Sequence, residues 1–196
     1  MKKLAYTFVM QFIIAFFLTA ALSAQEYMAS VESSTVKWEG KKVVAGGHYG
    51  TIDIKSGEFK FTDGMLTAAE VVMDMSTIVS DDLTGGSKER LEGHLKSDDF
   101  FGVDKFAESG FVMESALKAE GDMLKISGQM TIKGKTNPQS FTARIDMSNN
   151  TIEGKMEIDR SLYDVRFGSG KFFDNLGDKA INDIFTLEFT IKLEDN

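Results

Sequence analysis

The chain contains no cysteine and a single proline, and only 2 of its 196 residues are histidines. The absence of cysteine excludes disulfides, a thiol nucleophile and a lipid anchor built on a cysteine. The two histidines stand outside any recognised metal spacing, and no glycine-rich phosphate loop of the P-loop or dinucleotide-binding type occurs. The sequence therefore predicts neither a metal nor a cofactor.

Basic residues are too few to balance the acidic ones. The chain has 30 Asp and Glu against 22 Lys and Arg, which gives a formal net charge of -8 at pH 7. An acidic surface repels phosphate backbones and anionic headgroups. We therefore expect neither nucleic acid nor an anionic membrane surface as a partner.

One long apolar run stands at the N-terminus. Two lysines precede the run from Leu4 to Leu22, and small residues follow it. This pattern predicts a secretory signal peptide over residues 1–24, with cleavage after Ser23 or Ala24. An uncleaved membrane anchor is the alternative, because the run approaches the roughly 20 residues that span a bilayer. We expect residues 25–196 to form one periplasmic or secreted domain, with no stable membrane anchor after cleavage.

Beyond this run, apolar and polar residues alternate with period two, which is typical of half-buried strands. Asp63-Gly64 is a strong hairpin signal, and Ser56-Gly57 also indicates a turn. About eight evenly spaced strands avoid open edges by closing into a barrel, although a two-sheet sandwich gives nearly the same pattern. The predicted fold class is therefore all-β, an extended eight-stranded antiparallel barrel with a short helical insertion. The nine alternating segments that supply these roughly eight strands are 36–40, 52–55, 58–61, 66–75, 111–119, 123–132, 140–147, 151–158 and 185–193.

The helical insertion is predicted between Ser80 and Gly102, where widely spaced leucines stand among charged residues. The stretch from Glu92 to Phe106 adds a histidine and three phenylalanines to these charges. We interpret this stretch as a helical lid over a cavity. The alternative is a polar loop that pins its phenylalanines into an ordinary core.

Phenylalanine and methionine are plentiful, at 16 and 11 residues. Both can line an adaptable apolar pocket, and an eight-stranded barrel can hold one small ligand, although an ordinary core has the same composition. We expect a long apolar ligand in the interior. The candidate lining residues are Trp38, Phe59, Phe61, Phe100, Phe101, Phe111, Phe141 and Phe189.

Three polar residues are candidates for the head-group end of that ligand, namely His48, His94 and Arg160. Arginine binds phosphate in a fork geometry, and a positive group would offset the acidic surface. Alternatively, Arg160 pairs with Asp159 or Asp164 to hold a turn. A rival function is a hydrolase or isomerase acting on a lipid in the same cavity, with His94 as base and an aspartate as its orienting partner.

Four sequence blocks resemble the YceI-like family, in order and spacing, across essentially the whole mature chain. They are Gly-Gly-His-Tyr-Gly at 46–50, Gly-His-Leu-Lys-Ser-Asp-Asp-Phe-Phe at 93–101, Ser-Gly-Gln-Met-Thr-Ile-Lys-Gly at 127–134 and Ile-Asp-Arg-Ser-Leu-Tyr-Asp-Val-Arg-Phe-Gly at 158–168. The resemblance implies a lipocalin-like barrel, usually periplasmic or secreted, that binds a polyisoprenoid or similar long lipid in its interior. It establishes no enzymatic activity. One departure is Lys105-Phe106-Ala107, where the family often has Lys-Tyr-Pro.

Three classes of function therefore stay open. The first is binding of a long-chain isoprenoid or similar amphiphilic lipid for carriage, storage or sequestration. The second is a lipid-modifying enzyme, and the third is a ligand-free structural or stress-response protein with a filled core. The sequence is compatible with a monomer and with a homodimer.

Overall fold

A computed structural model describes residues 23–196, so nearly all of the predicted signal peptide lies outside the described residues and stays a prediction. The elements are, in chain order, β1 (Ala24–Ala29), β2 (Thr35–Lys42), β3 (Gly47–Thr62), β4 (Met65–Ser80), α1 (Gly85–Lys96), β5 (Glu108–Lys118), β6 (Met123–Ile132), β7 (Lys135–Asp146), β8 (Thr151–Asp159), the 3-10 helices η1 (Arg160–Tyr163) and η2 (Gly177–Lys179), and β9 (Ile181–Asp195).

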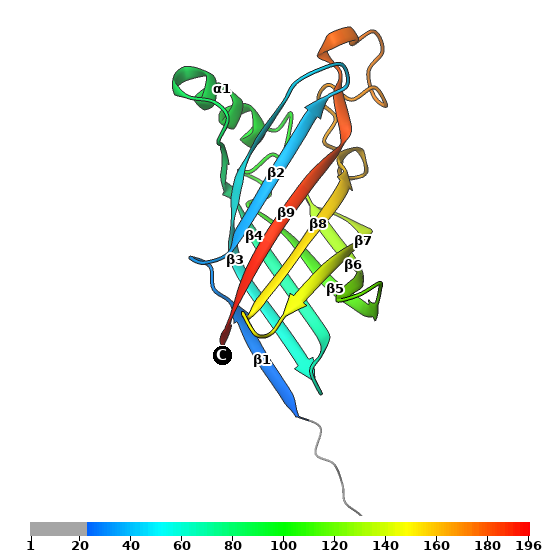
Figure 1. Ribbon diagram of the computed structural model, residues 1–196. Coiled ribbons are helices and arrows are strands. Elements are labelled where there is room, and N and C mark those ends of the chain that lie inside the picture. The colour runs from blue at the N-terminus through cyan, green and yellow to red at the C-terminus, as the bar shows by residue number, and fades with distance from the viewer. Residues whose placement is uncertain (1–22) are drawn as a thin grey trace, which may run out of the picture.

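Strands β2 to β9 form a closed antiparallel barrel (Figure 1). Each of these strands pairs with the next one along the chain, and β9 closes the ring by pairing with β2. A closed sheet has no free edge of the kind that an open sheet exposes. The predicted eight-stranded barrel is therefore confirmed, and the sandwich is excluded.

The additional strand β1 was not predicted from the sequence. It pairs with residues 58–62 of β3 and 193–195 of β9, whereas β2 pairs with the opposite ends of the same two strands. β1 and β2 are thus two halves of one interrupted strand in the barrel wall. β1 completes the lower half, at the bottom of Figure 1.

Strand β3 is continuous over 16 residues, so the predicted turn at Ser56-Gly57 is wrong. Its pairing with β4 shifts register between Ile54 and Ser56, and such a bulge changes which residues face inward. Ile54 is buried before the shift and Phe59 after it. Gly57 serves close packing instead of a turn, because a Cβ on it would lie 2.7 Å from Cβ of Ala29 in β1.

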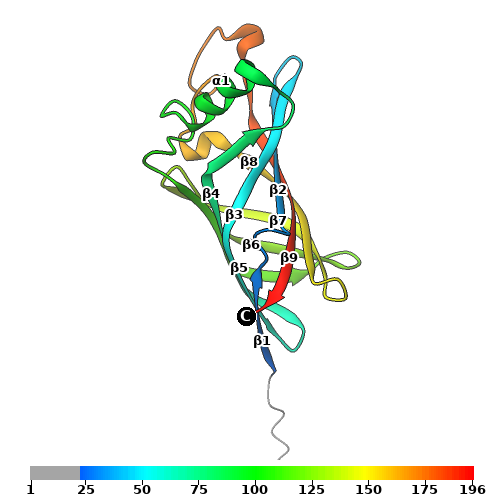
Figure 2. The same cartoon turned by 90° about the vertical axis from the view of Figure 1, so that its left-hand side faces the viewer.

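Helix α1 packs against β4 at the upper end of the barrel (Figure 2). It ends at Lys96, where the N–H of Ser97 donates to the carbonyls of Gly93 and His94. The predicted helical lid is therefore helical only in its first part. Beyond Ser97 the chain forms turns, and Gly102 adopts a φ of 62° that favours glycine.

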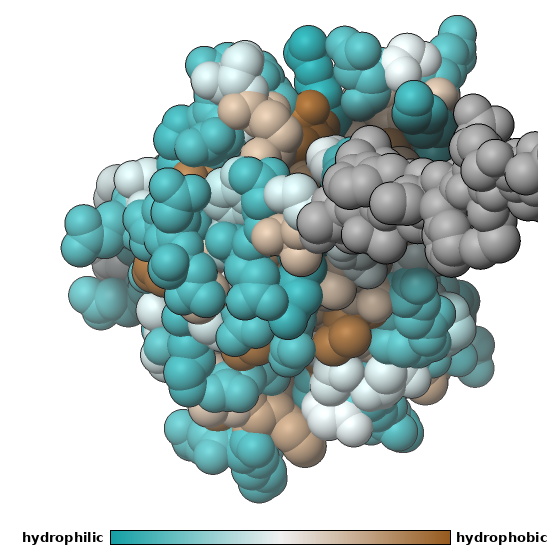
Figure 3. Space-filling view, turned by 90° about the horizontal axis from the view of Figure 1, so that it is seen from below, coloured by the Kyte–Doolittle hydropathy of each residue, from teal (hydrophilic) through white to brown (hydrophobic). Residues whose placement is uncertain are grey.

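The lower end of the barrel presents a mostly hydrophilic surface, as Figure 3 shows from below. Inside this end, the ring of Phe61 packs edge-on against Tyr27 at a centroid distance of 5.6 Å. Both residues belong to the buried hydrophobic core. The interior is thus filled at the bottom, and the space that remains lies above it.

Candidate functional site

Two cavities lie inside the barrel, an upper one of about 140 Å³ near α1 and a lower one of about 70 Å³. Met73, Met130 and Leu187 line both cavities, and we call these three residues the waist. Ligand pockets for drug-sized molecules usually have about 300 Å³ or more. Since the same three side chains line both cavities, we expect a molecule that fills both to displace them, and methionine is flexible enough to allow this.

The predicted cavity residues divide between the two spaces. Trp38, His48, His94, Phe100, Phe101 and Arg160 line the upper cavity. Phe59, Phe111, Phe141 and Phe189 line the lower one.

Phe61 is the exception, because it lines neither cavity. Its side chain is only 1% exposed and packs in the filled lower end against Tyr27. Its side chain points into the barrel, as the alternation along its strand predicts, but it lies below both cavities. Alternation along a strand gives the face of a residue and says nothing about where the interior is empty.

The lining also includes aliphatic and methionine side chains that the sequence analysis did not name as site residues. Met75, Ile78 and Leu91 are examples in the upper cavity, and Leu66 and Met156 in the lower one. A usable signal existed for some of them, since Met73 and Met75 share one face of the alternating segment that became β4. They were left out because only aromatic and polar residues were predicted to line the cavity.

Glycines in the wall let three aromatic rings pack closely against it. A Cβ on Gly50 would lie 2.9 Å from the Trp38 ring, and one on Gly154 would lie 2.5 Å from Cζ of Phe189. In the same way, a Cβ on Gly128 would lie 2.7 Å from Cζ of Phe111. Real Cβ atoms do not approach other atoms so closely, so side chains at these positions would displace the rings. At Gly50 and Gly128 an added Cβ would also lie 1.8 Å from the Val79 carbonyl oxygen and 2.1 Å from that of Val112, so these two glycines chiefly allow close approach of the backbone.

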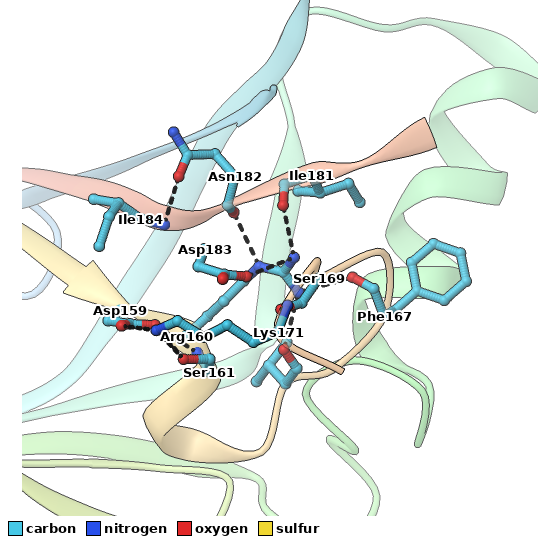
Figure 4. Close-up of polar contacts among 11 residues, drawn as sticks. Asp159, Arg160, Ser161, Phe167, Ser169, Lys171, Ile181, Asn182, Asp183 and Ile184 are labelled. Carbon is cyan, nitrogen blue, oxygen red and sulfur yellow. Dashed lines mark hydrogen bonds and ion pairs between the residues drawn. The ribbon is translucent and has the colours of Figure 1, made fainter. Parts of the chain in front are cut away.

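Arg160 has its guanidinium donors committed to the protein (Figure 4). Nε donates to the Asn182 carbonyl at 3.0 Å, and Nη2 donates to the Ile181 carbonyl at 3.1 Å. Nη1 donates to the carbonyls of Val165 at 2.9 Å and Phe167 at 2.8 Å. The side chain therefore ties the loop after η1 to the start of β9.

The charge of Arg160 is balanced within the protein. Its Nη2 lies 3.5 Å from Oδ1 of Asp183, and the side chain is 2% exposed. Burial lowers the pKa of Arg160, while Asp183 and Asp159 act in the opposite direction. The salt-bridge partners considered from the sequence are paired elsewhere, Asp159 with Lys171 and Asp164 with Arg166.

The two histidines occupy different environments in the upper cavity. Nδ1 of His48 lies 2.8 Å from Oδ2 of Asp82. Burial acts to raise the pKa of Asp82, but hydrogen bonds from His48, Ser80 and Tyr49 together lower it. His48 is therefore held in place by an ionised carboxylate.

His94 lies among aromatic rings. Its centroid is 4.3 Å from that of Phe167 and 5.7 Å from that of Phe100, both in edge-on arrangements. Its Nε2 is buried and has no hydrogen-bond partner among residues 23–196. Among the described residues, the Asp–His pair that forms is Asp82 with His48, so the orienting aspartate expected for His94 stays a prediction.

Within the part of the chain that the structure describes, no group of three or more His, Asp or Glu side chains is placed to hold a metal ion. No helix of residues 23–196 has the length and apolar character needed to cross a bilayer.

Comparison with known sequences gives partial matches to curated relatives. A UPF0312 protein of Staphylococcus aureus (strain USA300) is 34% identical over 88 residues, which are 40% of this chain and 48% of the relative. A UPF0312 protein of Shewanella sp. (strain ANA-3) is 33% identical over 126 residues, which are 63% of each protein. The matches thus span from about half to less than two thirds of the length of these relatives.

Solved structures with the same fold cover more of the chain. BcnA of Burkholderia cenocepacia is 18% identical, with a TM-score of 0.64 over 85% of this chain and 99% of that one. A polyisoprenoid-binding domain from Saccharophagus degradans, implicated in plant cell wall breakdown, is 11% identical, with a TM-score of 0.59 over 87% of this chain and 98% of that one. The profile of the YceI-like domain matches residues 27–193, which is nearly all of the described chain. The chain therefore belongs to the family of YceI-like domains.

Proposed function

We propose that the protein binds a long-chain isoprenoid or a similar amphiphilic lipid inside the barrel, for carriage, storage or sequestration. The observation that carries this proposal is the pair of cavities along the barrel, lined mainly by apolar side chains and separated by the waist. A narrow, elongated and apolar space fits a chain better than a compact polar molecule. The likeness in fold to a domain named for polyisoprenoid binding also supports this ligand class.

The length of the ligand follows from the energetics of burial. Each buried methylene contributes about 0.8 kcal/mol, so a five-carbon isoprene unit contributes on the order of 4 kcal/mol. Association costs about 4–15 kcal/mol in lost freedom before any affinity remains. About four isoprene units are therefore needed for firm binding, and such a tail would have to pass from the upper cavity beyond the waist.

We propose binding without catalysis, in the periplasm or outside the cell. The histidine that pairs with a carboxylate is His48, with Asp82, and not the candidate base His94. The extracytoplasmic location rests on the signal peptide predicted over residues 1–24. A homodimer would leave this proposal unchanged, because one chain encloses both cavities.

Mass spectrometry of organic extracts from the purified protein tests the proposal directly, followed by uptake of isoprenoids by the stripped protein. Gly40 offers a blocking variant, because it lines the upper cavity and a Cβ there meets nothing within 4 Å. Gly40→Leu should fill the space and abolish uptake without loss of stability. Gly170→Leu is the matched control, since that exposed loop glycine also has nothing within 4 Å of its added Cβ. Absence of any co-purifying lipid, together with equal uptake by both variants, would refute the proposal.

A further inference from the structure

The positive charge at the head-group end of the upper cavity is poorly available to an anionic ligand. The donors of Arg160 are used by four backbone carbonyls, and Asp183 lies 3.5 Å from its Nη2. An anion placed beside it would have to break these bonds or remain uncompensated in a buried site, which is costly. The other cations of the wall, Lys41 and Lys42, are exposed at the rim.

His94, whose side chain belongs to the cavity wall, carries a polar atom in the opposite situation. Nε2 of His94 is buried and lacks a hydrogen-bond partner among the described residues, while the rings of Phe100 and Phe167 fix the imidazole from two sides. A buried polar atom without a partner costs about 1–3 kcal/mol, and a ligand that supplies the partner recovers this free energy. Neutral imidazole carries one donor and one acceptor, so Nε2 can serve a carbonyl or a hydroxyl according to the tautomer.

We propose that His94 Nε2 binds the head group of the lipid and that this head group is an uncharged oxygen, a carbonyl or a hydroxyl, rather than a phosphate. This inference rests on the proposed function, since it names the class of head group that the same cavity selects. Arg160 then acts only as a support, holding the loop that carries Phe167 against β9. The expectation that Arg160 binds an anionic head group is thereby replaced.

Four ligands with comparable tails separate the alternatives: a quinone with a geranylgeranyl tail, geranylgeraniol, geranylgeranyl pyrophosphate and the hydrocarbon phytane. The wild-type protein should bind the quinone and the alcohol more tightly than the pyrophosphate. His94→Phe keeps the aromatic packing and removes Nε2. It should weaken binding of the quinone and the alcohol by about tenfold, which corresponds to one buried hydrogen bond.

The same variant should leave the affinity for phytane unchanged and the melting temperature equal or higher, because an unpartnered buried nitrogen has been removed. A purely structural role for His94 predicts the reverse, with lower stability and equal losses for all four ligands. If His94→Phe does not fold, His94→Gln provides the test, since its amide should retain part of the preference for the quinone over phytane.

The outcomes distinguish this inference from the function on which it rests. Pyrophosphate binding as tight as alcohol binding, or equal weakening of all four ligands by His94→Phe, would overturn the inference and leave lipid binding intact. Failure of the wild-type protein to bind any of the four, phytane included, would overturn the proposed function itself.

Discussion

Replacing Arg160 by methionine separates a supporting role from a binding role. Methionine has a similar length and fits an apolar space, but it donates no hydrogen bond. The carbonyls of Val165, Phe167, Ile181 and Asn182 would all lose their donor. Asp183 would also lose the cation that lies 3.5 Å from its carboxylate.

The size of the effect follows from this set of contacts. A hydrogen bond from a charged donor contributes about 1.5–3 kcal/mol, but the four bonds share one side chain and the loop can relax, so their values do not add. Removing one partner of a buried ion pair costs about 3–5 kcal/mol, and we expect a loss of about 4 kcal/mol. For a chain of this length the melting temperature should then fall by about 10 °C.

Thermal and urea unfolding of the ligand-free protein measure this loss, and Arg166→Met is the matched control. Arg166 belongs to the same loop but is 57% exposed and pairs with Asp164. Exposed ion pairs of this kind contribute about 1 kcal/mol or less. A normal melting temperature for Arg160→Met, with selective loss of prenyl pyrophosphate binding, would refute the supporting role and restore Arg160 as an anion site.

Two further predictions concern the wall and a turn. Gly154→Ala should lower stability by about 1–2 kcal/mol and reduce binding of long tails, because the new Cβ would push the Phe189 ring into the lower cavity. Gly40→Ala has room for its Cβ and is the control, so equal melting temperatures for the two variants would contradict this packing. At Asp146, hydrogen bonds led by that from the Ser148 hydroxyl lower the pKa from 3.8 to about 2. The stability contributed by this carboxylate should be complete above pH 3.8 and be lost as the pH falls toward about 2; an NMR titration midpoint near 3.8 would disprove it.

The inward faces of the strands could be predicted because each strand carries its own pattern. Phe185, Leu187, Phe189 and Ile191 alternate with polar residues, and Leu187 and Phe189 do line the lower cavity. The period of two depends only on the backbone geometry of a single strand, so it is the same whichever strands lie beside it in the sheet. The number of such strands favoured closure into a barrel, but a two-sheet sandwich has the same pattern, and only the pairing of β9 with β2 decides between them.

Features that depend on distant partners could not be predicted in this way. β1 is short and begins beside the apolar N-terminal run, and its place is fixed by pairing with Phe59 and Leu193, far along the chain. The partners of Arg160 are backbone carbonyls, which every residue possesses, so they leave no trace in the sequence. Charged side chains nearby in the sequence, such as Asp159, were therefore considered as its partners, but Asp159 forms its ion pair elsewhere.

The waist formed by Met73, Met130 and Leu187 also bears on how long a lipid stays bound. A tail that ends in the upper cavity can leave without disturbing these side chains, whereas a longer tail must be drawn back past them. Each such withdrawal requires the methionines to rearrange while the tail still occupies their space. The dissociation rate should therefore drop in a step at the tail length that first reaches the lower cavity, so that residence time sorts lipids by length even where equilibrium affinities differ little.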